Sequence, residues 1–385
     1  MLLVNNMSIN KIGNKCCGCF ACRSVCHFGA IKTTRSFDGF LYPVVDDSLC
    51  TNCGLCEKVC PELNAQKKNL PISAYYGRCS DEKVLMTSSS GGAFSLLANI
   101  VLKMSGIIFG AVFDAKKKEV VIKNSNDVTL EQLKRSKYVE SNPLDSFLQV
   151  KEFLENDKFV MYVGLPCEIG GLKKFLNKDY DNLLLVDFLC GGSSSTINFQ
   201  EHLNFLENRY KSKVIDVNFR PKLYGWKEYS FKVDFENGKS YKTYAYLDTY
   251  FRGFVYEKAL IRNCCNSCSY SMGHDSDIIL ADFWGFRQVN GFKDDDKGMS
   301  LVMANNDKGI KWIEKIPNNQ FKKLEIENIQ YAFKPKNDKN IMKTMFLKNY
   351  KKYGFEKAAK KTYMKKTKIF KIKKIIKGAI KNVNN

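Results

Sequence analysis

The sequence predicts a fold of three parts: a small α+β module at the N-terminus, an α/β domain with a mixed sheet, and a basic helical C-terminal tail. Two identical cysteine runs lie within the first 70 residues, and short apolar segments that end in glycine turns and continue into helical patterns follow them. In addition, 17 lysines gather near the C-terminus. We therefore divide the chain into residues 1–70, 71–158, 159–335 and 336–385.

The N-terminal module is defined by two runs with the spacing C-x2-C-x2-C-x3-C. In two-cluster ferredoxins with this spacing, three cysteines of one run and the last cysteine of the other hold each [4Fe–4S] cluster. The sequence therefore predicts a ferredoxin-like module with two clusters and crossed ligation. The predicted ligands of the first cluster are Cys16, Cys19, Cys22 and Cys60. The predicted ligands of the second cluster are Cys50, Cys53, Cys56 and Cys26.

Two other uses of these cysteines are disfavoured. Zinc sites use paired C-x2-C knuckles and do not require a third closely spaced cysteine, repeated twice. A disulfide framework needs an oxidising compartment, and the start of the sequence shows no secretory signal. We therefore expect iron–sulfur clusters in a cytoplasmic protein.

The middle of the chain predicts parallel strands joined by helices. Residues 159–163 and 183–189 are apolar runs of strand length, and each ends at a glycine-containing turn before a helical pattern begins. Such strand–turn–helix units favour a parallel arrangement. Residues 229–246 alternate around Asn237 and Gly238, which predicts a hairpin with a tight Asn-Gly turn.

A second set of thiols lies in this α/β part. Cys167 and Cys190 each follow a predicted strand, where open parallel sheets place their ligand sites. Cys265 and Cys268 form a C-x2-C loop. These four could hold a third [4Fe–4S] cluster, and the alternative is that the first two are small buried hydrophobic residues. The roles of three other cysteines stay open: Cys17, Cys79 and Cys264, the last as an alternative to Cys265.

A phosphate-binding turn is predicted at Ser88, Ser89, Ser90, Gly91 and Gly92, directly before a helical pattern. The N–H groups and the positive dipole end of a helix N-terminus suit a phosphate, and two glycines allow it to approach closely. The same residues also suit an ordinary helix cap and turn. Neither the dinucleotide-binding nor the P-loop fingerprint occurs in the chain.

The order of these motifs resembles the coenzyme F-420 hydrogenase/dehydrogenase beta-subunit family over about residues 14–315. The resemblance rests on the cysteine runs, the turn at 88–92 and further segments of the chain. These segments are Ser136-Lys137-Tyr138-Val139, Gly164-Leu165-Pro166-Cys167, Leu189-Cys190, the loop from Cys265 to Cys268, Ala281-Asp282-Phe283-Trp284-Gly285, and residues 294–301.

The resemblance implies a flavoprotein, with FAD or another flavin, that also holds iron–sulfur clusters. It matches the four thiols of the possible third cluster to positions where the family places cysteines, and it makes Lys137 a candidate contact to a flavin or an anionic substrate. The alternative for Lys137 is a surface lysine. Many relatives have threonine at Leu165 and histidine at Gly191, and these departures concern the substrate pocket more than the clusters. Bacterial members of the family often have no evident link to coenzyme F-420, so the resemblance does not by itself imply this substrate.

The predicted function is an iron–sulfur flavoprotein oxidoreductase. A flavin would exchange a hydride with a carrier or substrate and pass single electrons to the clusters. The expected partner is a redox protein or a small electron carrier. One alternative is a non-enzymatic electron relay without flavin. A second is an iron–sulfur nucleic-acid-binding protein, which is disfavoured because the basic tail has no arginine for base readout.

The formal net charge of +21 is concentrated in the predicted tail. Residues 336–385 carry a net charge of +15, which leaves +6 for residues 1–335. Isoleucines recur there at helical spacing, with lysines between them, at Ile369, Ile372, Ile376 and Ile380. This pattern predicts an amphipathic helix that either binds an anionic membrane surface at the inner face of the membrane or packs on the domain.

Overall fold

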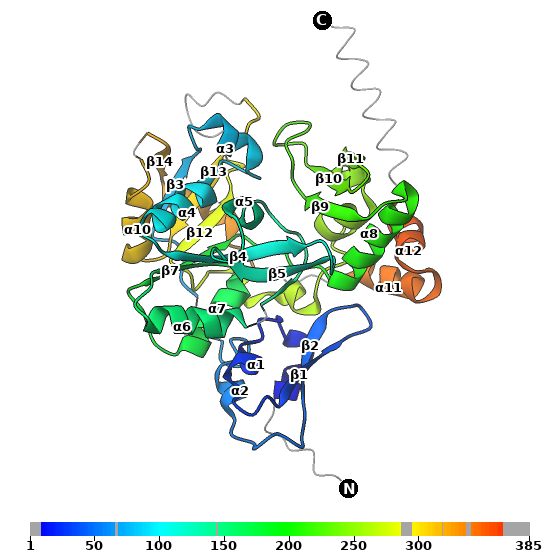
Figure 1. The fold of residues 1–385 in the computed structure, drawn as a ribbon, viewed down its shortest axis with the longest axis horizontal. Helices are drawn as coiled ribbons and strands as arrows, with labels where there is room; N and C mark the ends of the chain where they lie inside the picture. The colour runs from blue at the N-terminus through cyan, green and yellow to red at the C-terminus, as the bar shows by residue number, and fades with distance from the viewer. Residues whose placement is uncertain are drawn as a thin grey trace, which may run out of the picture.

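The computed structural model describes residues 9–65, 68–143, 145–285, 295–317, 319–335 and 340–364. The N-terminal module, drawn in blue in Figure 1, lies at one end of the molecule, below a larger body that contains all the other elements. The body contains a nine-stranded mixed sheet and a separate three-stranded sheet. The expected α/β class, with a large mixed sheet after a ferredoxin-like region, is thus confirmed.

The module repeats one local geometry at both cysteine runs. Its elements are the 3-10 helix η1 (Ile9–Lys15), α1 (Ala21–Val25), β1 (Ile31–Arg35), β2 (Leu41–Val45) and α2 (Leu55–Lys58). β1 and β2 pair antiparallel, with Ile31 opposite Val45. The residue before each short helix is left-handed, Phe20 with φ 55° and Gly54 with φ 74°. Both runs therefore turn in the same way directly after their second cysteine.

The large sheet has the order β14-β3-β13-β12-β8-β7-β4-β5-β6. Its strands are β3 (Ser73–Gly77), β4 (Ile107–Asp114), β5 (Glu119–Asn124), β6 (Ser141–Asn142), β7 (Val160–Val163), β8 (Leu183–Phe188), β12 (Ile278–Asp282), β13 (Ser300–Ala304) and β14 (Phe321–Leu324). The four central strands β4, β7, β8 and β12 run parallel, as the strand–turn–helix units predict. The boundary predicted from the sequence lies between residues 158 and 159. The sheet contains strands from both segments, 71–158 and 159–335, so the two segments form one sheet.

Helices cover both faces of this sheet. They are α3 (Glu82–Thr87), α4 (Ala93–Lys103), α5 (Leu130–Leu133), α6 (Ser146–Glu155), α7 (Pro166–Leu176) and α10 (Asp307–Glu314). Alternate residues of β4 belong to two different cores, because side chains of a strand point to opposite faces. Ile108 packs with the α4 and α10 side chains Leu97 and Trp312. Phe109 packs instead with the α6 and α7 cluster that contains Phe147.

The second part of the body is built around the three-stranded sheet. Its elements are α8 (Thr196–Tyr210), β9 (Val214–Asn218), β10 (Ser230–Phe235), β11 (Ser240–Tyr244), α9 (Thr249–Phe251), α11 (Ile341–Tyr353) and α12 (Phe355–Thr362). β10 and β11 form the predicted hairpin, with Gly238 at φ 76° in its turn. Short helical turns complete the body: η2 (Ala245–Leu247), η3 (Arg252–Tyr256), η4 (Asn263–Ser267), η5 (Ser269–Ser271) and η7 (Ile326–Ala332).

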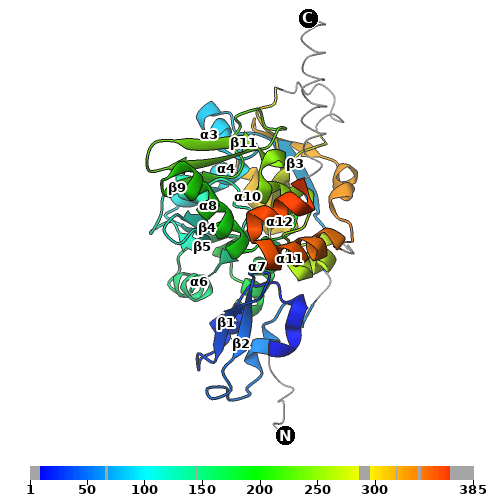
Figure 2. The ribbon, with the colours of Figure 1, turned by 90° about the vertical axis from the view of Figure 1, so that its right-hand side faces the viewer.

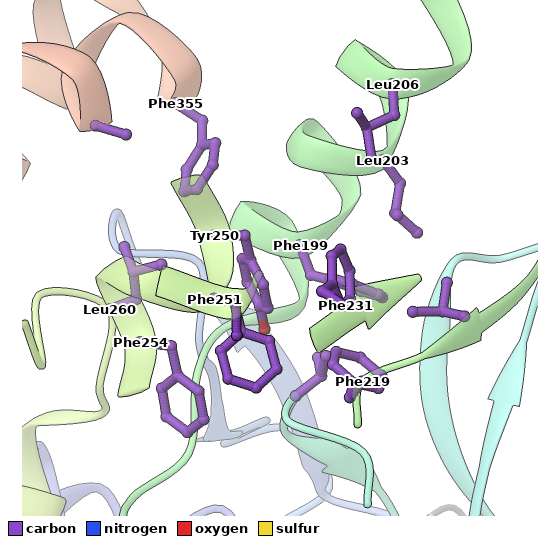
Figure 3. Close-up of a cluster of buried hydrophobic side chains, with 14 of the residues drawn as sticks. Phe199, Leu203, Leu206, Phe219, Phe231, Tyr250, Phe251, Phe254, Leu260 and Phe355 are labelled. Atoms are coloured by element: carbon purple, nitrogen blue, oxygen red, sulfur yellow. The ribbon is translucent and has the colours of Figure 1, made fainter. Parts of the chain in front are cut away.

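An aromatic core joins α8, this sheet and the two last helices (Figure 3). Phe199 of α8 lies 5.0 Å from Tyr250 and 5.3 Å from Phe219, measured between ring centroids. Phe355 of α12 joins the same cluster, and Figures 1 and 2 both show α11 and α12 beside α8. Residues 340–364, which the sequence assigns to a tail, are therefore part of the folded body.

The amphipathic helix predicted around Ile369 to Ile380 lies outside the described residues. Within the ranges that the structure describes, no helix is both long enough and apolar enough to cross a membrane.

A buried histidine ties α8 to α12. Nε2 of His202 lies 3.0 Å from Asp248, and its Nδ1 lies 2.7 Å from Glu356. Burial alone would lower the pKa of His202, but the two carboxylates outweigh it and raise the pKa to about 10. The ring therefore carries a positive charge at neutral pH.

We predict that Glu356→Gln destabilises the protein by about 1.5–3 kcal/mol at neutral pH, because it replaces the charged acceptor beside the His202 ring with a neutral amide. The pKa of His202 is higher in the folded state than in the unfolded state, where it is about 6.5. The stabilisation by the charged ring is therefore complete below about pH 6.5, and it is lost as the pH rises toward 10. The gap in unfolding temperature between wild type and variant should thus be widest near pH 6 and narrow toward pH 10. Glu152→Gln on the exposed face of α6 is the control, and an equal gap at all pH values would contradict the prediction.

Candidate iron–sulfur and thiol site

All 15 cysteines lie within the described residues, and none of them forms a disulfide. Most of them converge where the module meets the carboxyl ends of the central strands. They line two neighbouring pockets, which we call the module pocket and the thiol pocket.

The module pocket encloses about 300 Å³ and is lined by the four cysteines of one predicted cluster. These cysteines are Cys16, Cys19, Cys22 and Cys60, and the apolar walls include Ile9, Ile12 and Phe20. Three thiols therefore come from the first run and one from the end of the second. Burial raises the pKa of Cys22, and the neighbouring thiols raise it further. Bound iron would supply the charge that holds such thiols as thiolates.

The other predicted cluster set is only partly buried at the module core. Cys26, Cys50 and Cys56 pack against the same apolar cluster, whereas the side chain of Cys53 is exposed. The thiol of Cys50 donates to the side-chain oxygen of Asn52 at 3.7 Å. Three of the four residues thus pack against the module core, and the fourth lies at the surface.

The thiol pocket encloses about 560 Å³, is partly open, and is lined by six cysteines. They are Cys17, Cys167, Cys190, Cys264, Cys265 and Cys268. All four residues predicted for a third cluster are present, together with two more thiols. Among the described residues, no group of three or more His, Cys, Asp or Glu side chains is arranged to hold a metal ion. A single zinc ion would need thiolates at about 2.3 Å, whereas a four-iron cluster spreads its ligands around a larger body.

Two of these thiols are positioned by the ends of adjacent parallel strands. Cys167 lies in the first turn of α7, which begins at Pro166 directly after β7. Cys190 follows β8, and its sulfur accepts a hydrogen bond from the Gly192 N–H at 3.3 Å. β7 and β8 are neighbours in the sheet. The strand–turn–helix pattern therefore brings these two cysteines to one edge, as the sequence predicts.

Close packing holds the module against this edge of the body. A side chain on Gly171 of α7 would come within 2.8 Å of the Cys19 sulfur, so only glycine allows α7 to approach the module this closely. Cys17 lines both pockets and hydrogen-bonds to Cys167, which is the main reason that its pKa is lowered. The two pockets therefore share a wall.

Sequence reasoning gives Cys17 no role, although it lies at this wall. The signal that could have identified it is the adjacent pair Cys16-Cys17, because neighbouring residues of one loop can face two different pockets. The adjacent pair Cys264-Cys265 differs in this respect, because both of its residues line the thiol pocket.

The turn at residues 88–92 connects α3 to α4, and the packing of the protein itself explains one of its glycines. The Gly91 N–H donates to the Ser300 hydroxyl at 2.9 Å, and its carbonyl accepts from the Cys79 N–H at 2.7 Å. A Cβ atom on Gly91 would lie 2.5 Å from the backbone nitrogen of Ser300. Gly92 has φ 88° and precedes α4, which has no side-chain cap. A valine at Gly91 would therefore clash with β13 whether or not a phosphate binds nearby.

Lys137 is close to this turn in space, but its amine has other partners. The Ser136 N–H donates to the Ser89 hydroxyl at 3.0 Å, which joins the two segments. The Lys137 amine donates to carbonyls at the end of α5, including that of Leu133 at 3.1 Å. Burial lowers the pKa of Lys137 to about 7, and Arg135 lowers it further. This lysine is thus partly buried and caps α5.

The comparisons with known proteins identify the two main parts of the chain. Residues 15–64 match the family model of the 4Fe-4S dicluster domain. Residues 157–331 match the family model for the C terminus of the coenzyme F420 hydrogenase/dehydrogenase beta subunit. The chain is therefore similar to a 4Fe-4S dicluster domain over its N-terminal module and to the F420 hydrogenase/dehydrogenase beta subunit over much of its body. The expected resemblance is thereby confirmed for these two parts of the chain.

Two individual proteins are similar to parts of this chain. The coenzyme F420-dependent sulfite reductase of Methanocaldococcus jannaschii is 30% identical over 165 residues, which are 41% of this chain and 25% of that protein. The match thus spans a quarter of the length of the curated relative. A chain of the F420-reducing [NiFe] hydrogenase complex from Methanosarcina barkeri is 16% identical, with a TM-score of 0.43, over 78% of this chain and 94% of that chain. That low score carries no conclusion.

We predict that Cys60→Ala removes the cluster held by the first cysteine run, although Cys60 belongs to the second run. Because its sulfur completes the module pocket, the remaining three thiols leave one iron without a protein ligand. Electron paramagnetic resonance of the reduced protein should lose one of two centres, and iron should fall by about four per chain. Cys79→Ala, a buried thiol outside both pockets, is the control. Loss of the cluster of the second run instead would show that ligation is not crossed.

Proposed function

We propose that this chain is an iron–sulfur flavoprotein oxidoreductase that moves electrons between a two-electron carrier or substrate and its [4Fe–4S] clusters. The observation that carries this proposal is the six-thiol pocket directly beside the module pocket, with Cys17 in the shared wall. A cluster in the thiol pocket would bring a third redox centre next to the dicluster domain. Electrons could then pass between the body and the module without crossing solvent.

The proposed ligands of the third cluster come from three separate parts of the body. Cys167 and Cys190 stand at the ends of β7 and β8, and Cys265 and Cys268 belong to the loop around η4. The set fits iron rather than a disulfide pair, because all four thiols face one space with two more thiols nearby. Cys17 and Cys264 remain alternative ligands within the same pocket.

A flavin is the group that would convert a two-electron transfer into single-electron steps. We propose the N-terminus of α4 as the place where its phosphate binds, because α4 has no side-chain cap and is eleven residues long. The backbone N–H groups of the first turn and the dipole of the helix would contribute the attraction. The role of Gly92 would be to start the helix in a left-handed conformation without a side chain at this end.

The names of the similar proteins suggest which electron carrier to test first. The curated relative is named for coenzyme F420, so this carrier is the first two-electron donor to test. Leu165 and Gly191, which depart from the family pattern, lie at or beside the thiol pocket and could alter this preference. The one-electron partner would be a redox protein or a small carrier. The lysine-rich residues 365–385 remain our candidate for contact with an anionic membrane surface.

We predict about twelve irons per chain in protein purified without oxygen, four for each of three clusters. The double variant Cys167→Ala, Cys190→Ala should lose about four of them and keep the two dicluster signals. Iron, acid-labile sulfide and flavin analyses on the same preparations provide the measurement. Cys79→Ala controls for the loss of a buried thiol that lines neither pocket.

Two results would change the proposal in different ways. About eight irons in both the wild type and the double variant would exclude the third cluster and make Cys167 and Cys190 packing residues. Intact clusters in protein that binds neither FAD nor FMN would instead favour an electron relay that serves a partner enzyme. A Gly91 variant cannot decide the flavin question, because that residue is required for packing against Ser300.

A further inference from the structure

Arg262 is a buried arginine at the boundary between the module and the body. It is 1% exposed, and it lies two positions before Cys264, on the loop that closes the thiol pocket. Its backbone holds this loop in place: the N–H donates to the Ser193 carbonyl at 2.9 Å, and the carbonyl accepts from the Cys265 N–H at 3.1 Å. The guanidinium therefore extends from the segment that carries three of the pocket thiols.

The guanidinium contacts the first cysteine run directly. Nε donates to the Cys16 carbonyl at 2.7 Å, and Nη2 donates to the Leu41 carbonyl at 2.6 Å. Nη2 also donates to the sulfur of Cys16 at 3.7 Å. A side chain on Gly18 would lie 2.9 Å from Nη1, so the run folds closely around the cation. The positive charge is thus held against a predicted ligand of the first cluster.

A carboxylate between two arginines leaves a net positive charge at this place. Nη1 of Arg262 lies 3.2 Å from one carboxylate oxygen of Glu140, and Nη1 of Arg35 on β1 lies 3.6 Å from the other. Two guanidiniums and one carboxylate give one positive charge in excess. Another buried pair that joins module and body is Lys343 with Asp38, at 2.7 Å, and it is balanced.

We propose that Arg262 is a fixed positive charge that raises the reduction potential of the cluster at Cys16. On reduction the cluster accepts one electron from a one-electron donor, which is oxidised, and the negative charge of the cluster grows by one. The guanidinium and its N–H to sulfur hydrogen bond stabilise that added charge, and the buried site screens it little. Neither a proton nor a bond changes at Arg262. The proposal needs only the dicluster domain and stands with or without the third cluster.

The test is a redox titration of the full chain at pH 8, with dithionite as reductant and electron paramagnetic resonance as readout. Arg262→Gln should lower the reduction potential of one of the two dicluster centres. The expected effect is a tenfold change in the equilibrium constant for reduction, which corresponds to 59 mV for a one-electron couple. Arg262→Lys keeps the charge and should retain most of the wild-type potential. Glu140→Gln removes the opposing charge and should move the same potential upward.

The two variants should shift the potential in opposite directions, and this difference distinguishes an effect of charge from an effect of loosened packing. Loosened packing would admit water in both Arg262→Gln and Glu140→Gln and move the potential in one direction, and that result would overturn the proposal. Arg220→Gln, a buried arginine paired with Asp282 at 2.5 Å, should leave both potentials unchanged. If Arg262→Gln does not retain iron, Arg35→Gln replaces it as the test, because it removes the second positive charge beside Glu140 from a partly exposed position. An unchanged potential in Arg35→Gln would also overturn the proposal.

Discussion

The convergence of thiols at the boundary between module and body is the constraint on which the rest of the structure depends. In the main core cluster of the module, the buried aliphatic side chains are those of Ile9, Ile12, Ile31 and Val45, and the other buried members are Cys16, Cys22 and Cys60. A domain this small usually needs metals or disulfides to be stable, and the structure contains no disulfide among its 15 cysteines. Cluster ligation would therefore supply folding free energy as well as redox centres.

The body is shaped to receive this module at one edge of its sheet. Parallel strands place their carboxyl ends together, so Cys167 and Cys190 reach the same edge, and Gly171 leaves room for the Cys19 sulfur. Charged contacts then fix the orientation of the module, with Arg262 reaching the Cys16 carbonyl and Lys343 reaching Asp38. A buried ion pair adds little net stability compared with apolar packing, so its contribution lies mainly in selecting one docked arrangement.

The sequence predicts what depends on local spacing and misses what depends on distant contacts. The strand–turn–helix units and the Asn237-Gly238 hairpin are local patterns, and the structure contains the arrangements that they imply. The cysteine intervals are a local pattern as well, and they lie in the part of the chain that matches a 4Fe-4S dicluster domain. Arg262 is separated from Cys16 by 246 positions, and no local pattern marks a buried arginine. Lys343 falls within the predicted basic tail because charge along the chain does not reveal which lysine is buried. A glycine at position 91 suits a phosphate site, and it equally suits close packing against Ser300. The sequence alone therefore does not distinguish the two roles.

The proposed electron transfer would require a rigid docked arrangement of module and body. Transfer between centres becomes slower steeply with distance, so a module that shifted on the body would separate the two pockets that Cys17 now joins. The cation that helps to fix this distance also lies against a predicted ligand of the first cluster. Geometry and potential are thus set by the same side chain, Arg262. A lysine would supply the charge but not the fork of donors that reaches Cys16, Leu41 and Glu140 together, and for that reason the position requires arginine.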